Sequence, residues 1–155
     1  PAAGAGLALA LACDIRIAVA SAFVTTGYIH VGLSGDYGIA ALLTRTVGTA
    51  RARELMFTGD RVNSERCEKL GIFNRVVTDG ALRETAFEMA LSIASGPRQA
   101  LGFMKDNLEE ALKHTFEESL DGEASRLIQS TLNTDHREAV TAFIEKRRPN
   151  FKKYA

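Results

Sequence analysis

The sequence has little of what marks disulfide-rich, membrane-spanning or nucleic-acid-binding proteins. Its 155 residues include two cysteines, Cys13 and Cys67, too few for a disulfide framework, so we expect a reducing, cytoplasmic compartment. Basic and acidic residues number 19 each, and the zero net charge predicts neither a nucleic-acid nor an anionic membrane partner. The apolar run at residues 7–12 is too short to span a bilayer, because Asp14 and Arg16 end it.

Metal and targeting signals are also missing. No histidine, cysteine and aspartate side chains have the spacing of metal ligands, and no secretory signal is visible, so we expect no metal and no separate cofactor. The chain starts at Pro1 without methionine, inside what the pattern predicts to be a structural element. We therefore expect that an N-terminal portion is missing, with removal of an initiator methionine before Pro1 as the alternative.

What the sequence does have is a turn of small residues at its start. Residues 1–14 read PAAGAGLALALACD, which predicts a glycine turn that opens an apolar helix. Gly4 and Gly6 allow backbone angles and close approaches that a Cβ forbids. The first N–H groups of a helix have no partner within it and carry the positive end of its dipole. Such a turn is suited to a phosphate or an oxyanion, and tight packing against a neighbouring segment is the alternative.

The order of elements predicts an α/β part followed by a helical part. Periodicity and breakers predict strands and helices up to about residue 80, and helices after it. The expected elements are helix 7–13, strand 14–20, strand 23–26, an irregular segment 27–38, helices 39–47 and 49–57, helix 64–70, strand 72–77, and helices 78–95, 97–113, 115–132 and 135–147. Asp135 and Glu138 have the spacing of a capping box for the last helix. Helices that follow one another with few strands pack on each other or on another subunit.

These motifs together resemble the enoyl-CoA hydratase/isomerase (crotonase) superfamily. Residues 1–18 (PAAGAGLALALACDIRIA) resemble its signature, residues 23–33 its second active-site segment, residues 51–77 its middle helices and last strand, and residues 142–147 its C-terminal helix. The resemblance implies an α/β fold of the crotonase-like β-β-α spiral type. Residues 1–80 would hold the later part of the spiral with the active-site loop. Residues 81–155 would form a helical region that covers coenzyme A and makes a homotrimer or hexamer, and the N-terminal half of the family fold would be absent.

The resemblance also implies an acyl-CoA thioester as substrate, with coenzyme A as part of it. Family members polarise the thioester carbonyl with two backbone N–H groups, and the second of these falls on Ala5, next to Gly4. Phe143 and Lys146 match positions that contact the adenine and phosphates of coenzyme A. A core position for Phe143 and a solvated surface position for Lys146 are the alternatives.

The chain departs from the family at the catalytic carboxylates. The two glutamates of the hydratases fall on Ala8 and Tyr28, and neither side chain can do the work of a carboxylate. Asp36 remains, at a place where some isomerases and dehalogenases of the family carry an aspartate. It would act there as acid and base, and a cap on the helix that starts near Gly38 is the alternative. We therefore expect isomerase-type proton transfer rather than hydration; a coenzyme-A-binding or assembly subunit with little catalysis is the alternative.

Overall fold

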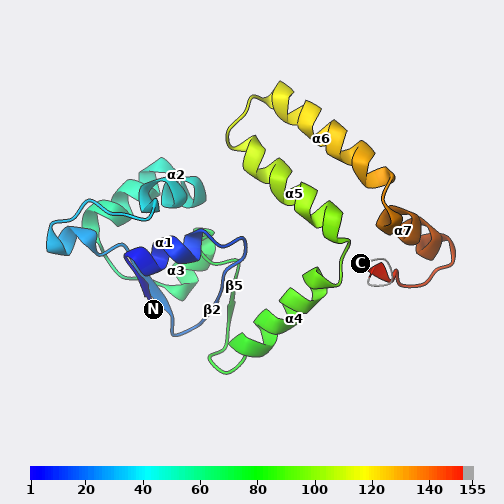
Figure 1. Ribbon diagram of the computed structural model, residues 1–155. Helices are drawn as coiled ribbons and strands as arrows, with labels where there is room; N and C mark the ends of the chain where they lie inside the picture. The colour runs from blue at the N-terminus through cyan, green and yellow to red at the C-terminus, as the bar shows by residue number, and fades with distance from the viewer. Residues whose placement is uncertain (152–155) are drawn as a thin grey trace. The chain divides into compact units, whose positions relative to one another are not determined.

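The computed structural model describes residues 1–151, which fall into two compact units. Unit 1 is Pro1–Phe87, and unit 2 begins at Glu88 (Figure 1). The roles that we assign from the sequence to residues 1–80 and 81–155 stay predictions. In chain order, unit 1 contains β1 (Ala2–Ala3), α1 (Ala5–Leu11), β2 (Ile17–Val19), β3 (Phe23–Thr25), the 3-10 helix η1 (Tyr28–Val31), α2 (Ile39–Thr58), β4 (Val62–Asn63), α3 (Ser64–Lys69), β5 (Arg75–Val77) and the start of α4 (Leu82–Ala94).

The strands of unit 1 form two small sheets. One sheet has the order β1-β3-β4, in which β1 and β3 are parallel and β4 is antiparallel to β3; the other is the parallel pair β2-β5. Ala2 lies opposite Val24, and Ala3 lies opposite Thr25. Parallel neighbours need a crossover, which α1 and β2 supply between β1 and β3. This pairing brings the turn after Ala3 next to the segment that follows Thr25.

The core of unit 1 forms where α1 packs against α2. Leu7 and Leu11 of α1 and Ile39 and Leu43 of α2 are buried in one apolar cluster. The apolar sequence of α1 does not bury the helix on every side, because Leu9 is 59% exposed. A short helix at the edge of this unit buries one stripe of side chains rather than its whole circumference.

The predicted break between two helices at Gly48 is confirmed. The span Ile39–Thr58 contains one residue outside helical geometry, Gly48, with φ 78° and ψ 164°. Gly59 ends the span with φ 63°, and a Cβ there would lie 2.8 Å from His30 Nε2. Glycine is required at this stop, because a side chain would collide with η1 as well as strain the backbone.

Unit 2 is helical. It contains the end of α4, then α5 (Arg98–Ala111), α6 (Phe116–Thr131) and α7 (Thr134–Ile144), and α5 and α6 lie side by side (Figure 1). Thr115 and Glu118 form a capping box at the start of α6. The capping box expected from Asp135 and Glu138 is wrong. Asn133 caps α7 by accepting the N–H of Asp135, and the Glu138 carboxylate accepts hydrogen bonds from Arg147 instead.

Few side chains of unit 2 are buried. Among its described residues only Glu138 and Ala142 are buried, and α4, α5 and α6 have no buried residue. Large apolar side chains are exposed instead on these helices and on α7: Phe87, Leu91, Ile93, Met104, Leu108, Phe116, Leu120, Leu127, Ile128, Val140, Phe143 and Ile144. Bare apolar faces of this extent are typical of surfaces that other protein covers.

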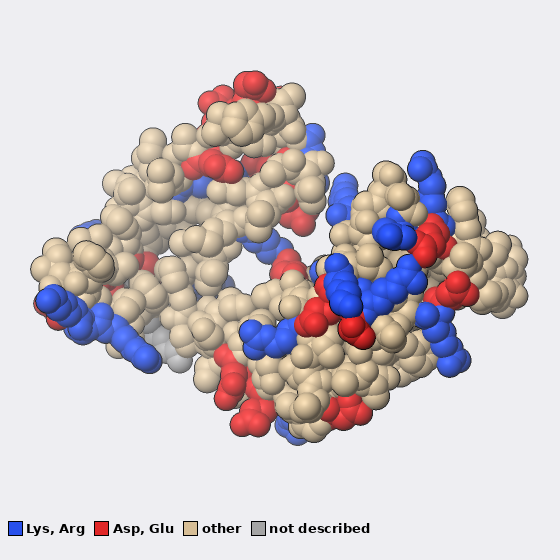
Figure 2. Space-filling view, turned by 180° about the vertical axis from the view of Figure 1, so that it is seen from behind, with Lys and Arg blue, Asp and Glu red and all other residues tan. Residues whose placement is uncertain are grey.

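Charged side chains of both signs are mixed on the face that Figure 2 shows. On the face seen in Figure 2, basic and acidic groups lie next to one another and do not separate into one basic and one acidic area. Within residues 1–151, no helix combines the length and the apolar character needed to cross a membrane.

Candidate active site

The turn before α1 is fixed to the sheet. Gly4 has φ 50° and ψ −121°, a conformation that costs any residue with a Cβ of order 1–3 kcal/mol. Its N–H donates to the Thr25 carbonyl at 3.0 Å, and its own carbonyl accepts the N–H groups of Leu7 and Ala8 at 3.0 and 3.1 Å. The main chain therefore leaves β1 and enters α1 within one residue, in a defined orientation.

The first amide of α1 is left without a partner. Ala5 begins the helix, and its N–H makes no hydrogen bond within residues 1–151. Gly4 offers no side chain as a cap, and the first turn carries no acidic residue. An unpaired N–H at the positive end of a helix can donate a hydrogen bond to a negatively charged oxygen. The use of the Ala5 amide as a donor to a thioester oxygen stays a prediction.

Tyr28 lies beside this turn. It is the first residue of η1 and is 8% exposed. A Cβ at Gly4 would lie 3.6 Å from its Cζ, and a Cβ at Gly35 would lie 3.7 Å from its Cδ2, so the ring packs between the two glycines. The Tyr28 hydroxyl donates to Asp36 Oδ1 at 2.6 Å. Burial raises the pKa of Tyr28 above its ordinary value of 10.0, and the hydrogen bond to the Asp36 carboxylate is the second cause. The hydroxyl therefore stays protonated at neutral pH.

Asp36 does not cap α2 with its side chain. The N-cap of α2 is Gly38, which has no side-chain cap, and only the main-chain carbonyl of Asp36 accepts the Ile39 N–H, at 3.0 Å. The alternative of a side-chain cap is therefore wrong. The carboxylate faces Tyr28 instead, and the residue as a whole is exposed.

The loop around Asp36 is held in an unusual backbone conformation. Gly35, Tyr37 and Gly38 all have positive φ, of 105°, 50° and 75°. Positive φ is uncommon for a bulky residue such as Tyr37 and is found where the surroundings enforce it, often at functional sites. At Gly35 a Cβ would lie 2.8 Å from Ile39 Cγ2, so the loop follows the start of α2 closely. These constraints fix where the Asp36 carboxylate leaves the main chain.

The other predicted site residues lie elsewhere. Ala8 is on α1, 1% exposed, within the core of unit 1. Phe143 and Lys146 are in unit 2, at the end of α7 and just after it. Phe143 is 84% exposed, so the alternative of a core position is wrong. Lys146 is exposed, with a positive φ of 55°, and its N–H donates to the Phe143 carbonyl at 3.2 Å.

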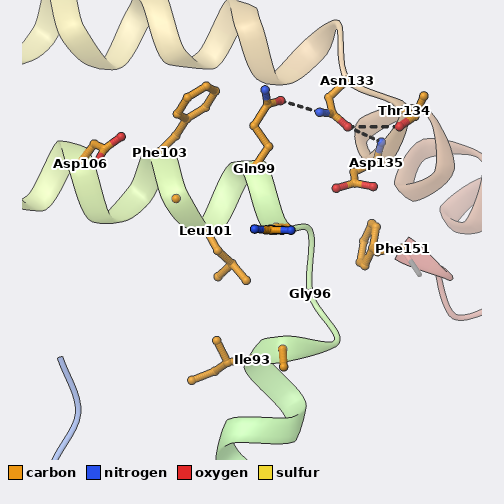
Figure 3. A pocket seen from close by; sticks show the side chains of 13 residues that line it. Ile93, Gly96, Gln99, Leu101, Phe103, Asp106, Asn133, Thr134, Asp135 and Phe151 are labelled. Atoms are coloured by element: carbon orange, nitrogen blue, oxygen red, sulfur yellow. Dashed lines mark hydrogen bonds between the residues drawn. The ribbon is translucent and has the colours of Figure 1, made fainter. Parts of the chain in front are cut away.

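Unit 2 also contains a hollow of about 760 Å³, which holds none of these predicted residues (Figure 3). Leu101 and Phe151 contribute apolar surface to it. Two of its polar side chains bond to each other, because Asn133 donates to Gln99 Oε1 at 2.6 Å; Asn133 also accepts the Asp135 N–H at 2.8 Å as the cap of α7. A site for chemistry needs polar groups that converge on open space, so we assign the candidate site to the Gly4 turn rather than to this hollow. No group of three or more metal-ligating side chains occurs in residues 1–151.

The sequence names Ala5, Tyr28 and Asp36 separately as candidates. It does not predict the hydrogen bond between Tyr28 and Asp36. Tyr28 and Asp36 are eight residues apart, across a 3-10 turn and a loop with positive φ. No helical or strand periodicity predicts such a contact. The available signal was the pair of glycines that pack against the Tyr28 ring, Gly4 and Gly35, because glycines mark close approaches.

A glycine turn presents the first amide of α1, and the neighbouring loop carries an acid. The family model described as enoyl-CoA hydratase/isomerase matches residues 1–154. The chain belongs to the enoyl-CoA hydratase/isomerase family. The resemblance found in the sequence is thereby confirmed.

Individual relatives agree with this assignment. The chain is 37% identical over 150 residues to the 1,2-epoxyphenylacetyl-CoA isomerase of Escherichia coli (strain K12), covering 97% of this chain and 57% of that protein. It is 33% identical to a short-chain-enoyl-CoA hydratase of Clostridioides difficile, with 89% of each covered. The crystal structure of an enoyl-CoA hydratase from Bacillus anthracis matches with a TM-score of 0.94 at 32% identity, covering 97% of this chain and 58% of that one. The predicted fold class is confirmed, and the chain spans little more than half the length of most of these relatives.

Proposed function

We propose that the protein to which this chain belongs is an acyl-CoA enzyme that moves a double bond by proton transfer and does not add water to it. The observation that carries the proposal is the Tyr28–Asp36 pair beside the Gly4 turn. Tyr28 stands where the resemblance puts the second glutamate of a hydratase, and its hydroxyl donates to the carboxylate of Asp36 at 2.6 Å. Tyr28 thus links a carboxylate to the turn that presents the amide expected to bind the thioester.

The Ala5 N–H is one donor of the proposed oxyanion hole. A thioester carbonyl placed on this amide gains negative charge when the neighbouring carbon loses a proton. The unpaired N–H and the start of the α1 dipole favour that charge. Removal of one such donor typically costs about 3–4 kcal/mol of barrier. The other donor of the family belongs to a segment outside the present chain.

Asp36 is the proposed acid and base. Its carboxylate takes a proton from a carbon of the acyl chain, and the C–H electrons shift into the conjugated enolate, whose charge lies on the thioester oxygen. The same carboxyl group returns the proton to a different carbon, so the double bond moves and no other reactant is consumed. Hydration by two glutamates is disfavoured, because position 8 is alanine and Tyr28 remains protonated at neutral pH.

Unit 2 supplies the proposed contacts to coenzyme A and to other copies. Phe143 is exposed and offers an aromatic face, and Lys146 offers an ammonium group to phosphate. The substrate brings coenzyme A itself, so no further cofactor is required. The bare apolar faces of α5 and α6 support assembly into a homotrimer or hexamer. Sedimentation of the full-length protein at the mass of one chain, at micromolar concentration, would contradict that assembly.

The experiment that tests the proposed reaction is Asp36→Asn in the full-length protein. The variant is expected to lose isomerisation of 3-hexenoyl-CoA to its conjugated isomer while it retains affinity for the thioester, because asparagine keeps the shape but does not accept the proton. Ser34→Ala, an exposed change in the same loop, is the control and is expected to keep the activity of the unmodified protein. Full turnover by Asp36→Asn would remove Asp36 from the mechanism.

A coenzyme-A-binding or assembly subunit with little catalysis is the second candidate. The observation that favours it is that neither glutamate position carries a carboxylate, since Ala8 and Tyr28 occupy them. A panel of enoyl-CoA thioesters distinguishes the two functions. Binding without turnover across the panel selects the subunit, and Asp36-dependent isomerisation selects the enzyme.

A further inference from the structure

The geometry points to Tyr28 as the positioning residue of the active site, which holds Oδ1 of Asp36 so that Oδ2 is the oxygen that carries the proton. This inference rests on the proposed function and adds to it the atom that reacts and the residue that selects it. Tyr28 itself touches no reacting atom in this assignment. It acts through the carboxylate of Asp36.

The hydrogen bond distinguishes the two oxygens of Asp36. Oδ1 accepts the Tyr28 hydroxyl at 2.6 Å, a short contact of the kind made to ionised acceptors. Oδ2 has no hydrogen bond within residues 1–151, and Asp36 as a whole is exposed. Oδ2 is therefore the oxygen left to take the proton, because Oδ1 already accepts a hydrogen bond.

The position of the Tyr28 ring links the acid to the helix start. The ring packs between Gly4 and Gly35, where an added Cβ would lie 3.6 Å and 3.7 Å from its atoms. Gly4 precedes the amide of Ala5, and Gly35 precedes Asp36. One side chain thus touches both the turn that presents the proposed donor amide and the loop that presents the acid. Because the ring is 8% exposed, its freedom to move is small, and it sets the spacing between these two segments.

The hydroxyl remains a donor throughout the reaction. Burial and the neighbouring carboxylate raise the pKa of Tyr28, so it does not serve as the base at neutral pH. When Oδ2 takes a proton from the substrate, the Tyr28 hydroxyl still donates to Oδ1, and the carboxyl group keeps its orientation for returning that proton. A donor fixed on one oxygen thus prevents the carboxylate from rotating between the two half-reactions.

The test is Tyr28→Phe in the full-length protein, assayed with 3-hexenoyl-CoA. Phenylalanine keeps the ring that packs between the glycines and removes only the hydroxyl, so the thermal unfolding midpoint is expected to stay close to that of the unmodified protein. We expect kcat to fall about tenfold to a hundredfold, as for loss of a hydrogen bond to a charged group, with KM unchanged. Tyr37→Phe, an exposed tyrosine next to Asp36, is the matched control and is expected to keep kcat.

The double variant Tyr28→Phe/Asp36→Asn separates positioning from a structural effect. If Tyr28 acts through Asp36, removing the hydroxyl has no further effect once Asp36 is asparagine; a structural defect lowers the residual rate in both backgrounds. Unchanged kcat in Tyr28→Phe, or an equal loss in both backgrounds, overturns the inference and leaves the role of Asp36 standing. If Asp36→Asn retains full turnover, the proposed function fails first and this inference fails with it.

Discussion

The N–H of Gly4 donates to the carbonyl oxygen of Thr25 at 3.0 Å, so the pairing of β1 with β3 continues one residue beyond the end of β1. The chain must then turn into α1 at once, which requires the positive φ of Gly4. The sheet pairing ends at Gly4, and the N–H of Ala5 has no partner within the described residues. A sheet hydrogen bond and a glycine conformation together create the free amide on which the proposed chemistry depends.

This arrangement predicts that Gly4→Ala destabilises the protein by about 1–3 kcal/mol, the usual cost of forcing a residue with a Cβ into a sparsely populated backbone region. The cost is conformational, because the added Cβ would meet its neighbours no closer than 3.6 Å. Gly6→Ala is the matched control. It adds a Cβ in a helical position with nothing within 4 Å, and stability is expected to stay unchanged or rise by up to about 1 kcal/mol. Urea unfolding measures both; equal stabilities would refute the backbone argument.

The sequence predicted most of the fold because its breakers are glycines with clear backbone roles. Gly48 divides α2 as expected, and the strands at residues 17–19, 23–25 and 75–77 lie within predicted strands. Periodicity reports burial of side chains, so it found the longer elements, with ends that differ by a few residues, and missed the two-residue strands β1 and β4. The capping box at Asp135 failed because a carboxylate three residues into a helix is also free to bind an arginine beyond its end, as Glu138 does with Arg147.

The candidate site was only partly predictable. Ala5 and Asp36 follow from the resemblance, which transfers positions one by one. The bond from Tyr28 to Asp36 does not follow from it, because it depends on a loop whose positive φ values no side-chain pattern encodes. The sequence also left undecided whether Phe143 is buried or exposed. An aromatic residue at the end of an amphipathic helix packs in a core as readily as it binds a ligand.

A second prediction concerns the pH dependence of unit 2. Arg126 of α6 forms an ion pair with Glu110 of α5 and lowers the pKa of that carboxyl below its ordinary value of 4.5. A carboxyl group whose pKa is lowered in the folded state stabilises the fold at pH values above the pKa of the unfolded state. This contribution is lost as the pH falls through the pKa of the folded state. The stability advantage of the unmodified protein over Glu110→Gln is therefore expected to be full above pH 4.5 and to shrink below it.

Asn107→Ala provides the control for this pair. It removes a neutral acceptor that the same guanidinium reaches at 2.8 Å, and an amide does not titrate in this range. Its effect on the free energy of unfolding is expected to be the same across the pH series. A difference between unmodified protein and Glu110→Gln that stays constant from about pH 7 to about pH 3 would contradict the prediction.

A third prediction concerns the proposed contacts to coenzyme A. Lys146→Ala is expected to raise KM for an acyl-CoA about tenfold with little change in kcat, because a contact to phosphate stabilises the ground state and the transition state alike. Phe143→Ala is expected to act in the same direction through loss of stacking. Lys113→Ala is the control; this exposed lysine lies 3.7 Å from Glu109 and has no proposed ligand. An unchanged KM in both Lys146→Ala and Phe143→Ala would exclude this surface from substrate binding.

The measurement that tests the central claim most directly is kcat of Ala5→Pro in the full-length protein, compared with Ala5→Gly. Proline is tolerated at the first position of a helix and removes only the N–H, whereas glycine keeps it. If the Ala5 amide stabilises the thioester oxyanion, Ala5→Pro loses about a hundredfold to a thousandfold in kcat while it still folds and binds acyl-CoA, and Ala5→Gly keeps kcat within the same order of magnitude. Undiminished turnover by folded Ala5→Pro would contradict the account.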